Sequence, residues 1–339
     1  MPSDEALLLM ANNVVFYVDG FYSSTDGHGG YYVLRANSYT QKGCLKISNS
    51  KYLCPLDTEF GRASNYIDVC RLGVREYPTS AINWNNITAQ NTYAELNSSI
   101  ISRITYPNLN TYLQFPEGRF FFKNPMNLTD YQLGIRGNAT PNCLWDAFLG
   151  DGNSASGTVL FFPFLTNGQT AITTSFGNIE NVAIVGNPTT YNLSIDRTKT
   201  ITAPNEVVTE TIKEVDGTAV KCTGVSKSTY GFIKNVVTWY FYTGITCSTA
   251  NIYIDTVYSR ACHFGLVVGG DTKVRGVYGW NVHTLLKITA SITSVIQVRV
   301  DSCVHAINVY NGSSINIMDV DGDYCTDTLI SIGETNAYK

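Results

Sequence analysis

An internal repeat constrains the fold of this chain more than any other feature of its sequence. Between residues 230 and 332, steps of 20 and 22 residues align His263 with His283 and then with His305, and steps of 21 residues extend the pattern at both ends. Each of the five units consists of short β-branched runs broken by Gly, Asn, Asp or Ser, without a helical period. Such a unit cannot bury its own apolar face, so we expect successive units to stack as the coils of a solenoid.

The aligned columns indicate that the coils are made of parallel strands. One column is apolar and should point inward; it holds Phe241, Cys262, Val282, Val304 and Cys325. The next column is the polar alternate and should point outward; it holds Tyr242, His263, His283, His305 and Thr326. Alternation of this kind has the period of a β-strand, and the leucine-rich consensus of another solenoid class is absent. The sequence therefore predicts an all-β fold, a right-handed parallel β-helix with stacked strands about 4.8 Å apart.

The composition argues against several classes of function. Charged residues make up 15% of the 339-residue chain, the net charge is −4, and no basic stripe is present, which disfavours nucleic-acid binding. Asp4 and Glu5 precede a short apolar run, unlike the start of a secretory signal. No stretch approaches the roughly 20 apolar residues of a membrane span. We therefore expect a protein that is made in a cytoplasm, does not insert into a membrane and uses no cofactor.

The nine cysteines are irregularly spaced, and none forms the close pair typical of a zinc site. Several of them, such as Cys262 and Cys325, fall in the apolar columns of the repeat. We interpret the cysteines as reduced, buried and packed as small hydrophobic residues.

Three segments can be distinguished along the chain. Residues 1–65 are interpreted as a small β-rich module, and residues 66–106 as a connecting strand followed by one helix. The helix should begin at Thr88, a suitable N-cap, because the apolar side chains that follow fall on one helical face. Residues 107–339 should form the β-helix. Within it, residues 187–229 lose the repeat and are interpreted as an inserted loop or hairpin, which either carries function or contacts a neighbouring subunit.

The order of these segments resembles a known family. A helix followed by FPEGRFFF (residues 115–122), LGIRG (133–137) and IENVAIVGN (179–187) is similar to the entry into pectate-lyase-superfamily β-helices. The upstream segment DGHGGYYV (26–33) resembles the module that precedes the β-helix in bacteriophage tailspikes, whereas CRLGV (70–74) departs from the Phe-Gly-Ala segment often found there. The resemblance implies an N-terminal helix that plugs the solenoid, a homotrimer, attachment to phage tail or baseplate proteins through the first module, and a bacterial surface polysaccharide as partner.

Carboxylates near the end of the repeat are the candidates for catalysis. Glycoside hydrolysis usually needs two carboxyl groups about 5 to 10 Å apart, and equivalent positions of adjacent coils lie at the strand spacing. The alignment places Asp301 over Gly322, and so between Asp321 and Asp323. The alternative is that these residues only form turns. A calcium site at Asp319, Asp321 and Asp323 is the weaker interpretation, because the spacing and the bidentate Glu of an EF-hand are absent, and we expect no metal.

Aromatic and histidine side chains are the candidates for substrate binding. Tyr278 and Trp280 lie close together on one coil, and Tyr258 shares a column with Tyr278. Exposed aromatic faces suit amphipathic ligands such as sugar rings. His283 and His305 belong to the histidine column, for which a neutral structural stack is the alternative.

We therefore expect a phage tail receptor-binding protein, located on the virion, that binds a bacterial surface polysaccharide. Whether it also cleaves the polysaccharide, as a hydrolase or a lyase, stays open, as do the host and the glycan. The alternatives are a structural or adhesive virion protein without enzymatic activity and a cellular polysaccharide enzyme of the pectate-lyase type. Because no C-terminal cap follows residue 332, we also expect the sequence to be a portion of a longer product.

Overall fold

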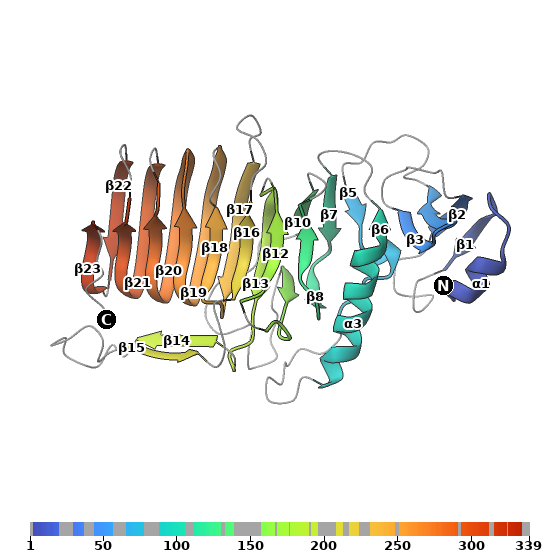
Figure 1. The fold of residues 1–339 in the computed structure, drawn as a ribbon, viewed down its shortest axis with the longest axis horizontal. Coiled ribbons are helices and arrows are strands. Elements are labelled where there is room, and N and C mark those ends of the chain that lie inside the picture. Colours follow the sequence, from blue (N-terminus) through green and yellow to red (C-terminus); the bar gives the residue numbers. More distant parts are fainter. Residues whose placement is uncertain are drawn as a thin grey trace.

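The computed structural model is an elongated stack of strands with a small sheet at its N-terminal end (Figure 1). It describes residues 3–19, 30–36, 44–56, 66–77, 88–105, 111–129, 133–138, 157–166, 168–175, 177–189, 191–195, 208–212, 217–223, 231–247, 251–290, 293–311, 315–323 and 325–333.

A parallel β-solenoid of about seven turns forms the body of the molecule, which confirms the predicted parallel β-helix. Each turn has three sides, here called A, B and C, and the strands of each side pair in parallel with those of the next turn. Side A contains β5 (Tyr66–Asp68), β7 (Thr111–Phe115), β10 (Leu133–Gly137) and the first parts of β13 (Ile179–Val185), β17 (Gly231–Trp239), β19 (Ile252–Val268), β20 (Thr272–Ile288), β21 (Thr293–Val309) and β22 (Ile315–Gly322).

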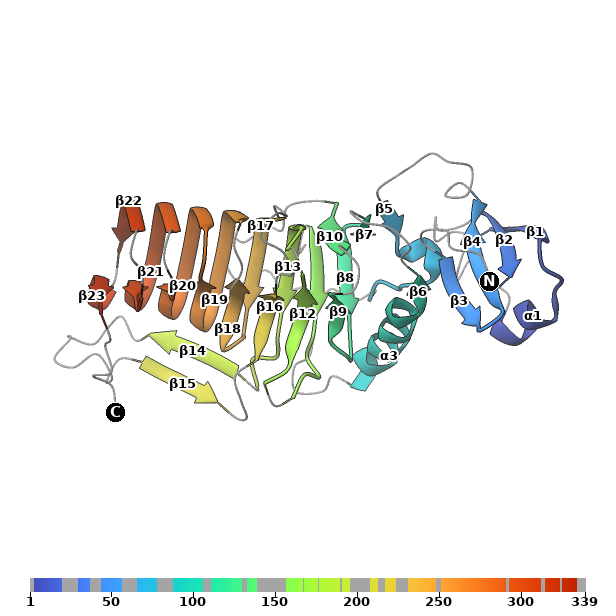
Figure 2. The same cartoon turned by 45° about the horizontal axis from the view of Figure 1, so that its top comes forward.

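Sides B and C continue the same turns. Side B contains β8 (Gly118–Phe121), β11 (Thr158–Phe161), the second half of β13 and β17, the middle of β19, β20 and β21, and the end of β22. Side C contains β9 (Met126–Leu128), β12 (Thr170–Thr174), β16 (Thr218–Cys222), β18 (Thr243–Cys247), the last parts of β19, β20 and β21, and β23 (Cys325–Ile332). Figure 2 shows the stack turned by 45°.

The register of the last turns differs by one residue from the predicted alignment, which was wrong there. Val274 pairs with Val295 and not with Ile296. Val295 is fully buried, whereas Ile296 is 38% exposed. In the same way, Cys303 occupies the inward column in the place predicted for Val304. A shift of one residue would exchange the inward and outward faces of a strand. Burial of the apolar side chains therefore fixes the step between these two turns at 21 residues.

A left-handed backbone residue forms the corner between sides A and B in each of six turns. The φ angles lie between 51° and 67° at Asn181, Asn235, Thr256, Gly276, Gln297 and Asp319. Asn and Gly adopt this conformation at low cost, because a short polar side chain or no side chain avoids the clash of the Cβ atom. The Nδ2 of Asn235 also donates to the Oδ1 of Asn181 at 2.9 Å, which links the corners of these two successive turns.

The helix α3 (Thr88–Arg103) lies at the N-terminal end of the solenoid, beside β8, as the family resemblance implies (Figure 1). Its buried Asn97 joins the helix to the first turn. The Oδ1 atom accepts from the backbone N–H of Arg75 at 2.7 Å, and the Nδ2 atom donates to the carbonyls of Arg75 and Phe121 at 3.0 and 3.1 Å. Ile100 and Ile101 enter the same apolar cluster as the solenoid core, so the helix covers the end of that core.

The N-terminal module is an antiparallel sheet with the strand order β1-β2-β4-β3-β6. Its elements are α1 (Asp4–Leu9), β1 (Val15–Val18), β2 (Gly30–Ala36), β3 (Cys44–Ser48), β4 (Lys51–Pro55) and β6 (Ile104–Thr105); the 3-10 helix η1 (Cys70–Leu72) follows β5. Because β6 follows α3 in the chain, the N-terminal sheet contains one strand that lies outside residues 1–65. The segment 20–29, which includes the first four residues of the DGHGGYYV segment (26–33), lies outside the described residues.

The expectation that all cysteines are reduced was wrong for one pair. Cys44 and Cys54 form a disulfide. They lie opposite each other because Leu45 of β3 pairs with Leu53 of β4, a register that the sequence did not specify. The other six cysteines among the described residues are free, and five of them are buried as expected.

An antiparallel hairpin of β14 (Tyr191–Ile195) and β15 (Val208–Ile212) leaves the solenoid after β13 (Figure 2). Its first strand packs against β19 and β20, where Tyr191 and Leu193 are buried. Within the segment 187–229, β16 already belongs to side C, so the chain returns to the solenoid before that segment ends.

Candidate functional site

The outward face of side B carries a column in which a guanidinium group lies between two indole rings. Trp239 pairs with Arg260, Arg260 with Trp280, and Trp280 with Asp301. The guanidinium carbon of Arg260 lies 4.2 Å from the ring centroid of Trp239 and 3.8 Å from that of Trp280. A cation over an aromatic face is attracted by the ring quadrupole. Trp239 is buried and Trp280 half-buried, so the stack fixes a partly accessible indole in place.

A second column runs beside the first, two residues earlier on each strand. Tyr258 and Tyr278 stack with their ring centroids 4.6 Å apart and their planes inclined by 16°. Both rings are half-buried. The column continues through Arg299 to Asp321, which are both exposed. Two aromatic stacks with charged groups at one end therefore lie side by side.

The same face is covered nearer the N-terminus. Tyr77 packs edge-on against Phe121 at 5.2 Å, and Phe121 stacks on Phe161 at 4.7 Å. These rings and the buried Ala94 of α3 belong to one apolar cluster. The accessible part of the face, here called the side-B surface, begins with β19 and consists of Tyr258, Arg260, Tyr278, Trp280, Arg299 and Asp301.

The carboxylates near the end of the solenoid do not have the predicted neighbours. Val300, rather than Asp301, pairs with Gly322. The backbone N–H of Asp323 donates to the carbonyl of Val300 at 3.0 Å. This register brings Asp323 next to Asp301 on the adjacent turn, whereas Asp321 pairs with Arg299 and has a cation as its neighbour.

Asp301 and Asp323 also differ in their surroundings. Asp301 is half-buried, and its Oδ1 accepts a hydrogen bond from the Oγ of Ser302 at 3.0 Å. Asp323 is exposed. One carboxylate is thus partly withdrawn from water, and the other is open to it. Such a difference in surroundings allows two neighbouring carboxyl groups to take different roles in catalysis.

The histidines form a shorter stack than the alignment predicted. Tyr242, His263 and His283 are stacked, with ring centroids 4.6 and 4.2 Å apart. His305 pairs with Thr284 instead of His283 and meets the His283 ring at 5.7 Å and 66°.

The surroundings of the histidines favour structural roles. The Nδ1 of His305 is 2.8 Å from the Oγ1 of Thr328, and the residue is only 2% exposed. Tyr191 of the hairpin packs edge-on against Tyr242 at 6.0 Å. His305 therefore lies out of reach of a polysaccharide on the surface, and one end of the stack is packed against the hairpin. Of the four predicted binding residues, Tyr278 and Trp280 lie together on side B.

The acidic residues of the calcium interpretation are Asp319, Asp321 and Asp323. Within the described ranges, no group of three or more His, Cys, Asp or Glu side chains is arranged to hold a metal ion. The corner position of Asp319, with a φ of 58°, separates it from the extended segment of Asp321.

Arg260 was missed by the sequence analysis. The signal was present: steps of 21 and 20 residues place Arg260 in one column with Trp239 and Trp280. A cation that alternates with two indoles in a column is recognisable once the register is known.

Neither a family model nor a curated protein matches this chain. Solved structures are similar at low identity. They include a tailspike protein of Acinetobacter baumannii bacteriophage Fri1, a capsular polysaccharide depolymerase (11% identity, TM-score 0.44, covering 97% of this chain and 61% of that one). WceF of Pantoea stewartii, a glycan biofilm modifying enzyme with a tailspike-like parallel β-helix fold, has 11% identity and a TM-score of 0.42 over 96% of this chain and 49% of its own. Tailspike protein 2 of bacteriophage CBA120 has 10% identity and a TM-score of 0.41, over 97% and 55%.

The chain thus spans between about half and three-fifths of the length of these proteins. They are tailspikes or tailspike-like proteins, the class that the sequence resembles. No helix among the residues placed by the structure is long and apolar enough to cross a membrane.

Proposed function

We propose that this protein is a phage tail receptor-binding protein that binds a bacterial surface polysaccharide on the side-B surface. The observation that carries the proposal is the pair of adjacent stacks, Trp239–Arg260–Trp280 and Tyr258–Tyr278, on the outward face of a rigid solenoid. Aromatic faces accept the C–H faces of sugar rings, and neighbouring charged groups donate to and accept from hydroxyl groups. A linear polymer can contact several turns at once, because equivalent positions recur at each turn.

Binding to capsular polysaccharide and lipopolysaccharide from candidate bacterial hosts tests the proposal. Trp280→Ala removes the most accessible indole of the stack, and we expect it to weaken binding at least tenfold, as truncation of a central aromatic anchor does. Tyr31→Ala is the matched control, because Tyr31 is 57% exposed but lies on the N-terminal sheet. Equal affinities for the wild type and Trp280→Ala would refute the assignment of the surface.

Cleavage of the polysaccharide is the second candidate function, and the adjacency of Asp301 and Asp323 favours it. The two residues lie one turn apart, and neighbouring strands are separated by about 4.8 Å, near the separation of the carboxyl groups in retaining glycosidases. We expect new oligosaccharide ends after incubation of the wild type with its polysaccharide, and none with Asp301→Asn/Asp323→Asn at polysaccharide concentrations that saturate the folded variant. Binding without product in the wild type would instead indicate an adhesive virion protein.

The assembly is proposed on the sequence resemblance. A homotrimer attached to phage tail or baseplate proteins through the N-terminal module fits the tailspike-like layout of the chain. Light scattering after size-exclusion chromatography should give three times the 37.3 kDa chain mass. A monomer that digests a soluble pectin-like polymer would support the cellular enzyme.

A further inference from the structure

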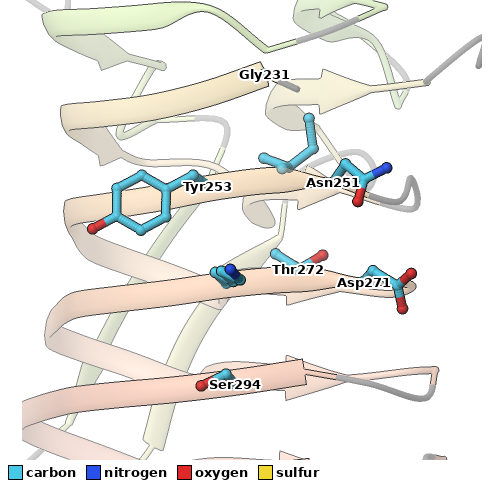
Figure 3. A pocket seen from close by; sticks show the side chains of 8 residues that line it. Gly231, Asn251, Tyr253, Asp271, Thr272 and Ser294 are labelled. Atoms are coloured by element: carbon cyan, nitrogen blue, oxygen red, sulfur yellow. The ribbon is translucent and has the colours of Figure 1, made fainter. Parts of the chain in front are cut away.

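A cavity of about 370 Å³ opens on side A, away from the side-B surface (Figure 3). It extends over four successive strands, with Gly231 on β17, Tyr253 on β19, Lys273 on β20 and Ser294 on β21. Because neighbouring strands lie about 4.8 Å apart, the cavity follows the solenoid axis for roughly 14 Å. The absence of a side chain at Gly231 leaves space at one end.

The floor of the cavity is apolar and is formed by buried residues of two paired strands. Ile252 and Thr272 pair with each other and are 3% and 1% exposed. The Oγ1 of Thr272 donates to the carbonyl of Gly269 at 3.0 Å, so its hydroxyl group is engaged within the protein. The backbone N–H of Asn251 donates to the carbonyl of Asp271 at 2.8 Å, which joins two turns at the rim and pre-forms the site.

The rim combines an aromatic ring with polar groups of both signs. Tyr253 is 40% exposed and lies on one side of the cavity, and Asn251 and Asp271 lie on the other (Figure 3). Lys273 and Asp271 are exposed and carry opposite charges. The rim therefore offers a carboxylate acceptor, an ammonium donor and a ring face, without a net charge.

We propose that this cavity binds one pyranose unit of a neutral glycan. The C–H face of the sugar packs on Tyr253 and the apolar floor, while Asp271 accepts from and Lys273 donates to its hydroxyl groups. Because the rim carries no net charge, it gives a sugar carboxylate no net attraction, and the desolvation of that carboxylate disfavours uronic acids. This inference rests on the proposed function only in assuming that the protein meets a polysaccharide. It concerns a second glycan-binding site, on a different side of the solenoid from the side-B surface.

Ligand-observed NMR with methyl glucoside, methyl galactoside, methyl N-acetylglucosaminide and sodium glucuronate tests the inference. We expect saturation transfer from the wild type to at least one neutral glycoside, with Kd in the millimolar range, and weaker transfer to glucuronate. Tyr253→Ala should lower the affinity at least fivefold, Asp271→Asn should also lower it, and Tyr31→Ala, on the N-terminal sheet, should leave it unchanged. Circular dichroism checks that each variant is folded.

The result separates this inference from the proposed function. Failure of every neutral glycoside to bind, or equal affinity in Tyr253→Ala and the wild type, would overturn the cavity assignment, even if polysaccharide binding depends on Trp280. Tyr253-dependent binding of a glycoside by a protein that ignores every surface polysaccharide would uphold the cavity and refute the proposed function. Preferred binding of glucuronate would refute the neutral specificity.

Discussion

Replacement of Asn97 by alanine should release the helix α3 from the first turn of the solenoid. Asn97 is fully buried and makes three hydrogen bonds, two with the backbone of Arg75 and one with the carbonyl of Phe121. The substitution removes all three bonds and leaves the backbone groups without that partner. The two partly buried bonds contribute about 1 kcal/mol each, and an unsatisfied buried carbonyl costs about 1–3 kcal/mol. We therefore expect the free energy of unfolding to fall by about 3–5 kcal/mol.

The matched control is Asn91→Ala in the same helix. The Nδ2 of Asn91 donates to the Oε1 of Glu95 at 3.1 Å on the exposed face. Such an exposed pair contributes little, and alanine has the higher helix propensity, so this variant should leave the unfolding midpoint nearly unchanged.

Guanidinium unfolding followed by circular dichroism measures both variants, and hydrogen exchange shows where the structure opens. We expect Asn97→Ala to lose protection in α3 and β8 before the later turns. Equal stabilities of Asn97→Ala and Asn91→Ala, or exchange that rises uniformly along the chain, would refute the role of Asn97 in joining the helix to the solenoid.

Three further perturbations test other features of the fold. Thr256→Asn should raise the melting temperature and increase the free energy of unfolding by up to about 1 kcal/mol, because a β-branched residue at a φ of 56° is strained and Asn is not. Thr256→Val should lower the melting temperature and the free energy of unfolding, and a decrease with Asn would contradict this explanation. Burial raises the pKa of the Cys262 thiol to about 12. The contribution of this thiol to the free energy of unfolding should therefore be complete below its ordinary pKa near 9 and be lost as the pH rises toward 12. Alkylation of Cys262 by iodoacetamide in the native protein at pH 8.5, detected by mass spectrometry, would contradict the burial. Reduction of the disulfide between Cys44 and Cys54, which are 10 residues apart, should destabilise the N-terminal sheet by roughly 3 kcal/mol; unchanged exchange protection in β3 and β4 after reduction would show that the bond does not support the sheet.

The solenoid and its capping helix could be predicted because their signals are periodic. The repeat fixed the coil length to within one residue, and the predicted helix from Thr88 is found as α3. The slip in the last turns arose because Val295 and Ile296 are both apolar, as are Cys303 and Val304. Hydrophobicity alone cannot tell which of two apolar neighbours points inward; the pairing of the strands in the assembled stack decides it.

The candidate site was only partly predictable for the same reason. Tyr278 and Trp280 lie on one face because they are two residues apart on one strand, which holds in any register. The placement of Asp323 next to Asp301 depends on the register between two turns, and the error of one residue gave Gly322 instead. Arg260 was missed because a charged residue in an aromatic column becomes meaningful only when its neighbours on both sides are known. The disulfide depends on the pairing of β3 with β4, which no periodic pattern specifies.

Hydroxyl-radical footprinting with a surface polysaccharide that the protein binds shows whether the side-B surface is the binding site. Mass spectrometry then reports the oxidation of each aromatic residue with and without the glycan. The side-B surface predicts protection of Tyr258, Tyr278 and Trp280 and unchanged oxidation of the exposed Tyr17 and Tyr31 on the N-terminal sheet. Unchanged oxidation of the three side-B residues at saturating polysaccharide would show that the polysaccharide does not bind on the side-B surface.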